Sequence, residues 1–462
     1  MALKIMLGVL FFFFYKGMWF TKNKRQNDRR LLMKKILAIN HEFVARSYIL
    51  FPTLLFAFSI IAHANIITFV WPFIFVYTVE KVMPFILDGR LNLASWSGVT
   101  KFCSVIAFIG GVLASIGIYF RFEWLASLAA ILIGFGVTGL KLLGDPNKEI
   151  SEIDLKRVNV IAGFSVIIGL IALGILLMKL PLVVGFVFYT FFLGLEVIYA
   201  YVVVKRDKTP LDLKFSFNLK TAFPAIAVLT VVFIISFFKK TGRISDFSWA
   251  LIVLAIIGII LELRNILGQP FKLFRIWLGA IKNYVIIYTL LFAFQQNKAY
   301  WIFIVFIELM LSGMLVGALS PKLQKLPLTT RYKTALICLT LGLFLTYTDY
   351  LYLLGTAITV FCAILLGKWA RKQVPDKYSS IDQKLSVFGS LCNQIILFGA
   401  LELISYFQLD NKSALLIPYI DHQQELQYSR EMFYLRVSMI TLFVITGIFV
   451  IYHDRKYLFV KN

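Results

Sequence analysis

Apolar stretches recur along the whole chain, and no other feature limits the possible folds so strongly. Most are close to the length of about twenty residues with which a helix crosses the ~30 Å hydrocarbon core of a bilayer. Apolar residues make up 60% of the 462 residues and charged residues only 15%, whereas soluble domains carry roughly 25% charged residues. The composition therefore predicts an all-α, polytopic integral membrane protein.

Fifteen apolar stretches are candidate spans, so we expect about 14 to 15 transmembrane helices arranged as hairpins. After the first stretch, the other fourteen pair into seven hairpins, most of them with very short outer turns. The candidate spans are residues 5–20, 47–62, 66–83, 102–120, 124–143, 158–178, 181–204, 221–238, 247–263, 276–294, 299–319, 333–347, 349–367, 385–405 and 434–452.

The order of basic and apolar segments predicts three parts. Residues 1–46 form an N-terminal span and a basic amphipathic cytoplasmic segment, and residues 47–266 form a first membrane helix bundle. Residues 267–462 form a second bundle, which includes a long outer loop at 408–433. The bundles leave no room for a sizeable soluble domain.

The hexapeptide TLLFAF occurs twice, at 53–58 and at 289–294, and each copy follows a basic amphipathic lead-in. Duplicated halves are common in transporters, so a true internal repeat is one explanation. Coincidence between two helices rich in Leu and Phe is the simpler one. The lead-ins themselves are candidates for elements on the inner membrane surface.

The distribution of Lys and Arg predicts the topology. If the first span enters from outside, the inner loops carry 36 of the 47 basic residues, as cytoplasmic loops do. We therefore expect a protein of the cell membrane with its N-terminus outside and its C-terminus in the cytoplasm. The net charge of +23 is spread over many short loops, which indicates membrane lipid, and no nucleic acid, as the partner.

The stretch from Trp301 to Leu319 holds a single ionisable residue, Glu308. A charge near the bilayer centre costs roughly 2.5–3.5 kcal/mol on insertion scales, so such a residue usually faces a bundle interior or a water-filled cavity. Burial also disfavours the ionised form, which makes protonation during a transport cycle plausible. Ser312 follows one turn later on nearly the same face, whereas Gly313 and Gly317 form a GxxxG pair suited to close helix packing.

Other polar residues also lie inside predicted spans. Glu196 is a second lone carboxylate, Glu402 lies nearer the outer end of its span, and Asn283 lies within another. Together with Glu308 and Ser312 they are our candidates for the lining of a substrate path. Separate buried hydrogen bonds to neighbouring backbone would account for each of them equally well.

The outer loop 408–433 brings together Asp421, His422 and Arg430. His and carboxylates are the usual proton carriers in catalysis, so this loop is a candidate site for acid–base chemistry. A loop of such length normally carries charges, and a solvated cap is the simpler interpretation.

Motifs for soluble cofactor chemistry are missing from the sequence. No GxxxxGK[ST], HExxH or GxSxG occurs, and the four cysteines have no zinc-ligand spacing. One GxGxxG, from Gly134 to Gly139, lies inside an apolar span, where close helix packing explains it better than dinucleotide binding. We expect no catalytic residue, cofactor or metal.

These observations favour a multi-pass transport protein: a flippase, exporter or permease that moves a lipid-linked or small amphipathic substrate. A separate cytoplasmic ATPase or another membrane subunit is a candidate partner, because the sequence shows no P-loop and the basic lead-ins offer a surface on which an ATPase could dock. The alternative is a membrane-embedded glycosyltransferase or polymerase acting on lipid-linked sugars at the outer face, for which the outer loop is the support. A scaffold for an envelope complex is a third possibility.

Overall fold

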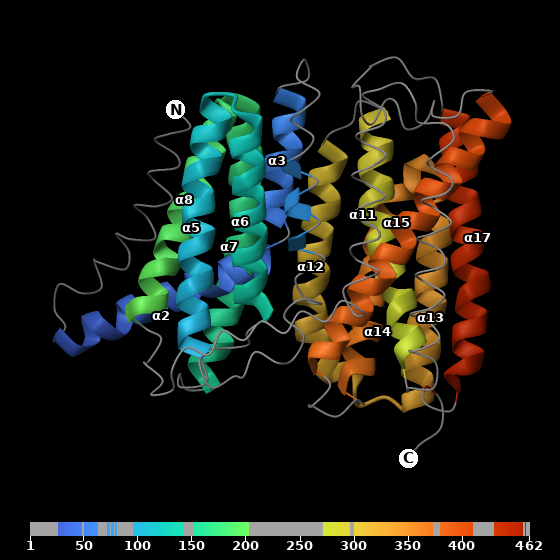
Figure 1. Ribbon diagram of the computed structural model, residues 1–462. Coiled ribbons are helices and arrows are strands. Elements are labelled where there is room, and N and C mark those ends of the chain that lie inside the picture. The colour runs from blue at the N-terminus through green and yellow to red at the C-terminus, as the bar shows by residue number, and fades with distance from the viewer. Residues whose placement is uncertain are drawn as a thin grey trace. The chain divides into compact units, whose positions relative to one another are not determined.

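The computed structural model is built from helices in every part that it describes (Figure 1). The chain forms two compact units: residues 1–83 with 87–216, and residues 84–86 with 217–462. The predicted boundary at 266/267 stays a prediction, because it falls outside the described residues. The described residues are 26–48, 50–62, 72–73, 75–77, 79–80, 96–142, 152–202, 271–295, 300–372, 379–409, 429–455 and 458.

The first unit packs its longer helices around α8 and α2. Helix α5 packs against α6 and α8, while α2 packs against α7 and α8 and crosses their direction at a steep angle (Figure 1). A small core of Leu37, Ala38, Val158 and Tyr199 joins α2, α7 and α8. The helices of this unit are α2 (Gln26–Ser47), α3 (Leu50–Ala62), α5 (Trp96–Tyr119), α6 (Glu123–Leu142), α7 (Glu152–Lys179) and α8 (Leu182–Val202).

The second unit is organised around α11, which contacts α12, α14, α15 and α17. Helices α13 and α14 form a hairpin beside it, joined through a short 3₁₀ helix. The helices of this unit are α11 (Lys272–Gln295), α12 (Tyr300–Leu323), α13 (Leu328–Leu345), η4 (Asp349–Leu351), α14 (Tyr352–Lys372), α15 (Ser379–Leu409) and α17 (Ser429–His453).

The all-α membrane fold is confirmed. Six helices among the described residues are long and apolar enough to cross a membrane. Two shorter apolar segments, 160–175 and 385–401, lie within α7 and α15. Each predicted span that lies wholly within the described residues coincides with a helix or a helix pair. The predicted spans 5–20, 221–238 and 247–263 lie outside the described residues.

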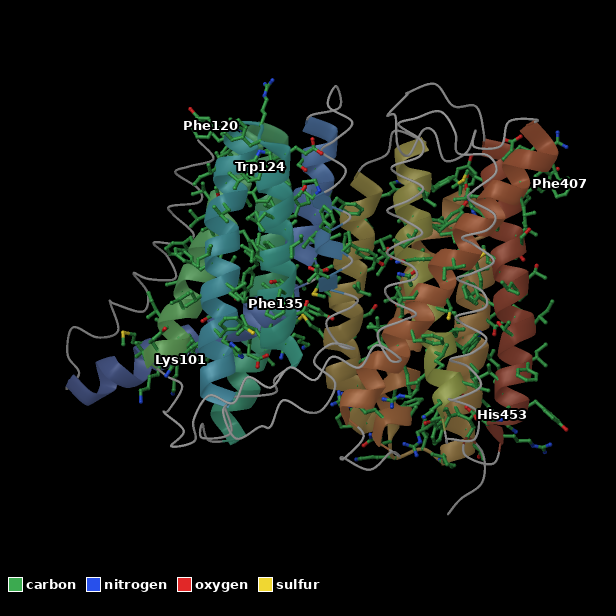
Figure 2. All side chains as sticks on the ribbon, viewed as in Figure 1. Lys101, Phe120, Trp124, Phe135, Phe407 and His453 are labelled. Atoms are coloured by element: carbon green, nitrogen blue, oxygen red, sulfur yellow. The ribbon has the colours of Figure 1, made fainter. Side chains whose placement is uncertain are left out.

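Several helices carry exposed apolar stripes. On α7, Phe164, Ile168 and Ile171 are about half exposed, and their spacing of four and three residues places them on one face. Exposing such stripes to water on several helices would cost free energy, whereas contact with hydrocarbon is favourable. Phe120 and Trp124 lie at one end of the α5–α6 hairpin and Lys101 at the other (Figure 2), as aromatic and basic residues at the two interfaces would.

Glycines determine several close helix contacts. A Cβ at Gly136 would meet the Cys103 carbonyl at 2.6 Å, so the GxGxxG segment serves α5–α6 packing as expected. In the second unit, a Cβ at Gly389 would overlap the Ile276 carbonyl, and one at Gly279 would overlap Ser386. These two glycines bring α11 and α15 into backbone contact.

The predicted packing at Gly313 and Gly317 is wrong for the described part of the chain. Both residues are exposed on α12, and a Cβ at either would meet nothing within 4 Å. The GxxxG spacing permits a close approach but does not supply the partner helix. Which face of α12 is covered depends on the neighbours of the helix.

The two TLLFAF copies occupy different local structures. The first belongs to α3, which begins at Leu50 after α2 has ended at Ser47. The second lies within α11, which runs unbroken from Lys272 to Gln295. The second lead-in is therefore the first half of a long helix rather than a separate surface element.

Candidate substrate path

Glu308 lies on α12, about 12 Å along the helix from Tyr300 at 1.5 Å per residue. Its side chain is partly buried, and its Oε2 lies 2.8 Å from the hydroxyl of Thr356 on α14. The same hydroxyl lies 2.8 Å from the Leu353 carbonyl oxygen. A threonine hydroxyl has one proton to donate, and a carbonyl only accepts. The site therefore suits an ionised Glu308 that accepts from Thr356, and equally a protonated Glu308 that donates to it.

An aromatic group lies next to this carboxylate. Tyr352, one turn before Thr356 on α14, shares a 2.6 Å hydrogen bond with the Thr289 hydroxyl and stacks on Trp301 at 5.4 Å. Both tyrosine and tryptophan are nearly fully buried. Glu308 is thus bounded on one side by packed rings and hydroxyls from α11, α12 and α14.

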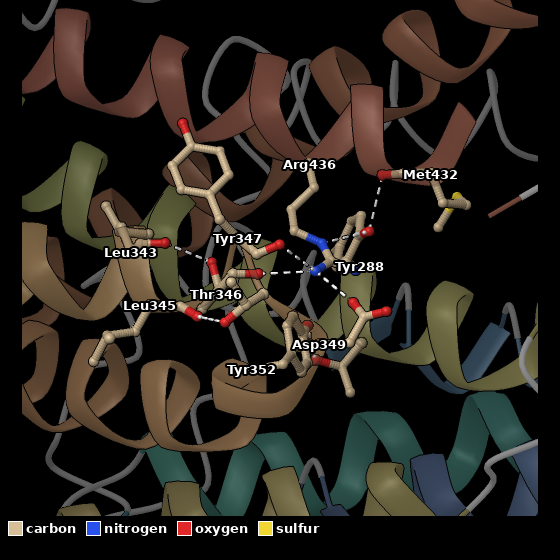
Figure 3. Close-up of polar contacts among 11 residues, drawn as sticks. Tyr288, Leu343, Leu345, Thr346, Tyr347, Asp349, Tyr352, Met432 and Arg436 are labelled. Carbon is tan, nitrogen blue, oxygen red and sulfur yellow. Dashed lines mark hydrogen bonds and ion pairs between the residues drawn. The ribbon is translucent and has the colours of Figure 1, made fainter. Parts of the chain in front are cut away.

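Arg436 of α17 makes the largest number of the polar contacts drawn in Figure 3. It is 1% exposed, yet its Nε donates to the Tyr288 hydroxyl at 3.0 Å and its Nη1 to Asp349 Oδ1 at 2.8 Å. Nη1 also lies 2.9 Å from the Thr346 carbonyl and 3.2 Å from that of Tyr347, at the end of α13. The rings of Tyr288, Phe292 and Tyr352 surround the guanidinium at 4.8 to 5.4 Å.

The hydrogen bonds of Arg436 hold helices of the second unit together. A cation is favourable at the C-terminal end of a helix, where carbonyl groups have no partner within the helix, and the surrounding rings add cation–π attraction. Arg436 thereby joins α17 to α11 and to the α13–α14 turn. Asp349, its carboxylate partner, remains 62% exposed.

The remaining predicted path residues of the second unit are dispersed. Asn283 is buried and accepts a 2.9 Å hydrogen bond from Asn393 Nδ2, which links α11 to α15. Ser312 is buried on α12. Glu402 lies on α15, but its side chain is outside the described part of the structure.

Glu196, the carboxylate of the first unit, is fully buried and paired. His41 Nδ1 of α2 lies 2.6 Å from Glu196 Oε1, and the His41 ring stacks on Tyr199 at 4.6 Å. Nearby, the Thr53 hydroxyl donates to Glu80 Oε2 at 3.4 Å. Glu196 Oε2 has no hydrogen-bond partner among the described residues.

The outer-loop site is only partly described. Asp421 and His422 lie outside the described residues, whereas Arg430 is exposed at the start of α17. Its Nε donates to the Tyr434 hydroxyl at 3.0 Å, one turn further on. Among the described residues, no group of three or more His, Cys, Asp and Glu is placed to hold a metal ion.

The sequence indicated the carboxylates but not their partners. His41 belongs to a segment whose sequence is typical of a surface lead-in, and Arg436 lies close to the start of the predicted span 434–452. The sequence pattern that indicates such a pair is a lone histidine or arginine beside one apolar stretch and a lone carboxylate within another. It does not say which of several charges meet.

Solved structures share this architecture. The chain resembles a POT family transporter in complex with 5-aminolevulinic acid, with a TM-score of 0.57, 15% identity, and 91% of this chain and 96% of that chain covered. The fold is that of a helical membrane transporter. The POT family transporter PepTSo (TM-score 0.54, 13% identity, coverage 92% and 97%) and the nucleoside transporter NupG (0.54, 13%, 92% and 99%) are similar to the same extent. No protein-family model and no curated protein sequence matches the chain.

Proposed function

We propose that this protein is a permease or exporter of the cell membrane that moves a small polar or amphipathic solute past Glu308. One observation carries the proposal: in a chain with a transporter fold over more than 90% of its length, Glu308 is a partly exposed carboxylate inside a span. Ionisable groups at membrane depth are costly and usually belong to substrate or ion pathways.

The hydrogen bonds of Glu308 support a role in proton coupling or in binding a polar group. Thr356 satisfies the carboxyl group in either protonation state, because its single proton can go to Glu308 or to the Leu353 carbonyl. Protonation can therefore change without a rearrangement of the helices. A cationic or hydrogen-bonding substrate group can take the place of the proton on the partly exposed side.

The substrate class is part of the proposal. The similar structures include a peptide transporter, a nucleoside transporter and a POT family transporter in complex with 5-aminolevulinic acid. A single carboxylate beside packed rings suits a solute of that size with a polar group. A lipid-linked cargo requires a path open to the bilayer, and vesicle assays with a labelled lipid-linked sugar distinguish the two classes.

A vesicle assay tests the proposal. We expect wild-type protein reconstituted alone to accumulate solute in response to a pH gradient, and Glu308→Gln to insert and fold normally but to lose transport or its dependence on the gradient. Gln retains the shape and removes the titratable group. Glu123→Gln, at the first residue of α6, is the matched control. Full, pH-dependent transport by Glu308→Gln would reduce Glu308 to a buried structural carboxylate.

The same assay addresses the partner. Transport that requires ATP and a cytoplasmic subunit would favour the ATPase-coupled exporter over a permease that acts alone. For the transferase alternative, the described part of the outer loop offers Arg430, which is bonded to its own helix, and Glu431, whose buried Oε2 has no hydrogen-bond partner among the described residues. Loss of activity on substitution of Asp421 or His422, with Glu308→Gln tolerated, would favour the enzyme.

A further inference from the structure

Four helix ends of the second unit lie near His453, where many side chains bear nitrogen atoms (Figure 2). The ring of Tyr332 at the start of α13 packs on Trp369 at the end of α14 at 5.8 Å, and on Phe274 at the start of α11 at 6.3 Å. The backbone N–H of Phe274 donates to Asp454 Oδ2 at 3.2 Å, which brings the end of α17 to the same place. We predict this end to be cytoplasmic.

Positive charge greatly exceeds negative charge here. Within residues 271–282, 320–333, 366–372 and 450–455, Asp454 is the single acidic residue. It is fully buried and already bonded to Phe274 N–H and His453. The basic residues of these segments are Lys272, Arg275, Lys282, Lys322, Lys325, Arg331, Lys333, Lys368, Arg371, Lys372 and Arg455.

Buried donors without acceptors distinguish this end from an ordinary basic surface. The indole N–H of Trp369 and the Nε of Arg331 have no hydrogen-bond partner among the described residues, although Trp369 is only 5% exposed. The Arg331 guanidinium lies over the Trp369 ring, 5.7 Å from its centre. Buried donors normally find acceptors, because leaving one unsatisfied costs its full desolvation penalty.

Arg275 adds a second buried cation to the group. It precedes the predicted span 276–294 and is 5% exposed, and burial together with the nearby Arg371 lowers its pKa to about 10. Arg371 is itself exposed, and an anion bound near the two guanidinium groups would interact favourably with both. The excess of Lys and Arg alone follows from membrane topology, but the orphan donors and the buried cation do not.

We propose that these helix ends bind a phosphate group, held by Arg331, Arg275 and the Trp369 indole N–H. Several donors around two guanidinium groups match the oxygens and charge of a phosphate better than they match one carboxylate. The phosphate has two possible sources, an anionic phospholipid headgroup of the nearby leaflet or a phosphorylated solute. This site is independent of the transport path at Glu308.

Ligand-induced stabilisation of the purified full-length protein in detergent tests the site. The probes are short-chain phosphatidylglycerol, short-chain phosphatidylcholine and inorganic phosphate. We expect phosphatidylglycerol to raise the thermal unfolding midpoint by several degrees in a concentration-dependent way, and phosphatidylcholine, whose headgroup is neutral overall, to have little effect. A rise with phosphatidylglycerol alone assigns the site to lipid, and a rise with inorganic phosphate as well assigns it to the phosphate group itself.

Three variants separate a specific site from diffuse charge. Trp369→Phe keeps the ring and removes the N–H, so we expect an unchanged or higher unliganded midpoint and a loss of most ligand-induced stabilisation. Arg331→Gln should lose it too, whereas Lys333→Gln, exposed on the same helix, should keep it. No stabilisation of the wild type by any phosphate probe would overturn the proposal. So would full stabilisation of Trp369→Phe, or a loss in Lys333→Gln equal to that in Arg331→Gln.

Discussion

Glu196 and Glu308 resemble each other in the sequence, as lone carboxylates in apolar spans, but their surroundings in the structure are opposite. Glu196 is fully buried and paired with His41 at 2.6 Å, whereas Glu308 is partly exposed and bonded to the hydroxyl of Thr356. A carboxylate with an ionisable partner holds helices together. The carboxylate with a hydroxyl partner and an open side is the one that we propose to meet a solute or a proton.

The largest expected difference is in stability. Glu196→Ala breaks the pair with His41, and we expect it to lower the free energy of unfolding by about 3 kcal/mol, the low end of the range for a broken buried pair. Glu308→Ala should cost about 1 kcal/mol, the value of one hydrogen bond. Unfolding by SDS titration of the purified variants measures both. Equal losses would abolish the distinction between the two carboxylates.

Thr356 provides the next test, this time of transport. Thr356→Val keeps the side-chain shape but removes the hydroxyl, so it should lower transport about threefold to tenfold, as the loss of a hydrogen bond worth roughly 0.5–1.5 kcal/mol would. Thr356→Ser restores the hydroxyl and should transport nearly normally. Initial rates in reconstituted vesicles give the comparison, and wild-type rates in Thr356→Val would show that the hydroxyl does not tune Glu308.

A double substitution tests whether the first-unit pair is structural. His41→Phe with Glu196→Met replaces two buried polar groups by apolar ones, and Phe retains the stacking on Tyr199. We expect stability within about 1 kcal/mol of the wild type, because apolar replacement of a whole buried pair is often neutral. Transport should persist. A folded double variant without transport would move the proton-handling role from Glu308 to this pair.

The smallest effect is expected at Gly317, on the same helix as Glu308. Because its neighbourhood is open, Gly317→Leu should change the free energy of unfolding by less than about 0.5 kcal/mol, as exposed substitutions usually do. Gly389→Leu is the contrasting variant, since its side chain would enter the Ile276 backbone and should prevent folding. Yield and SDS unfolding of both report the result, and a large loss in Gly317→Leu would reveal a helix against this face.

The length and position of the apolar stretches determined the transmembrane helices at the sequence level. A stretch of about twenty apolar residues is stable in hydrocarbon only when its backbone bonds are closed within one helix, so the positions of α5, α6, α8, α12 and α14 followed from composition alone. The topology with the N-terminus outside, which depends on loop charges, stays a prediction. The same reasoning identified Glu196 and Glu308 as unusual, because a carboxylate in such a stretch is costly wherever the helix packs.

The sequence alone therefore determined where the membrane-spanning helices lie and which carboxylates within them are costly. Both follow from the free energy of transferring each side chain from water to hydrocarbon. Tertiary structure decided the partners: His41 for Glu196, Thr356 for Glu308, and the α13 carbonyls and Asp349 for Arg436. It also decided that Gly389 is packed and Gly317 is open, although both are single glycines in apolar helices. The pairing of side chains depends on how helices that are distant in the chain pack together. The sequence of any single helix does not contain that information.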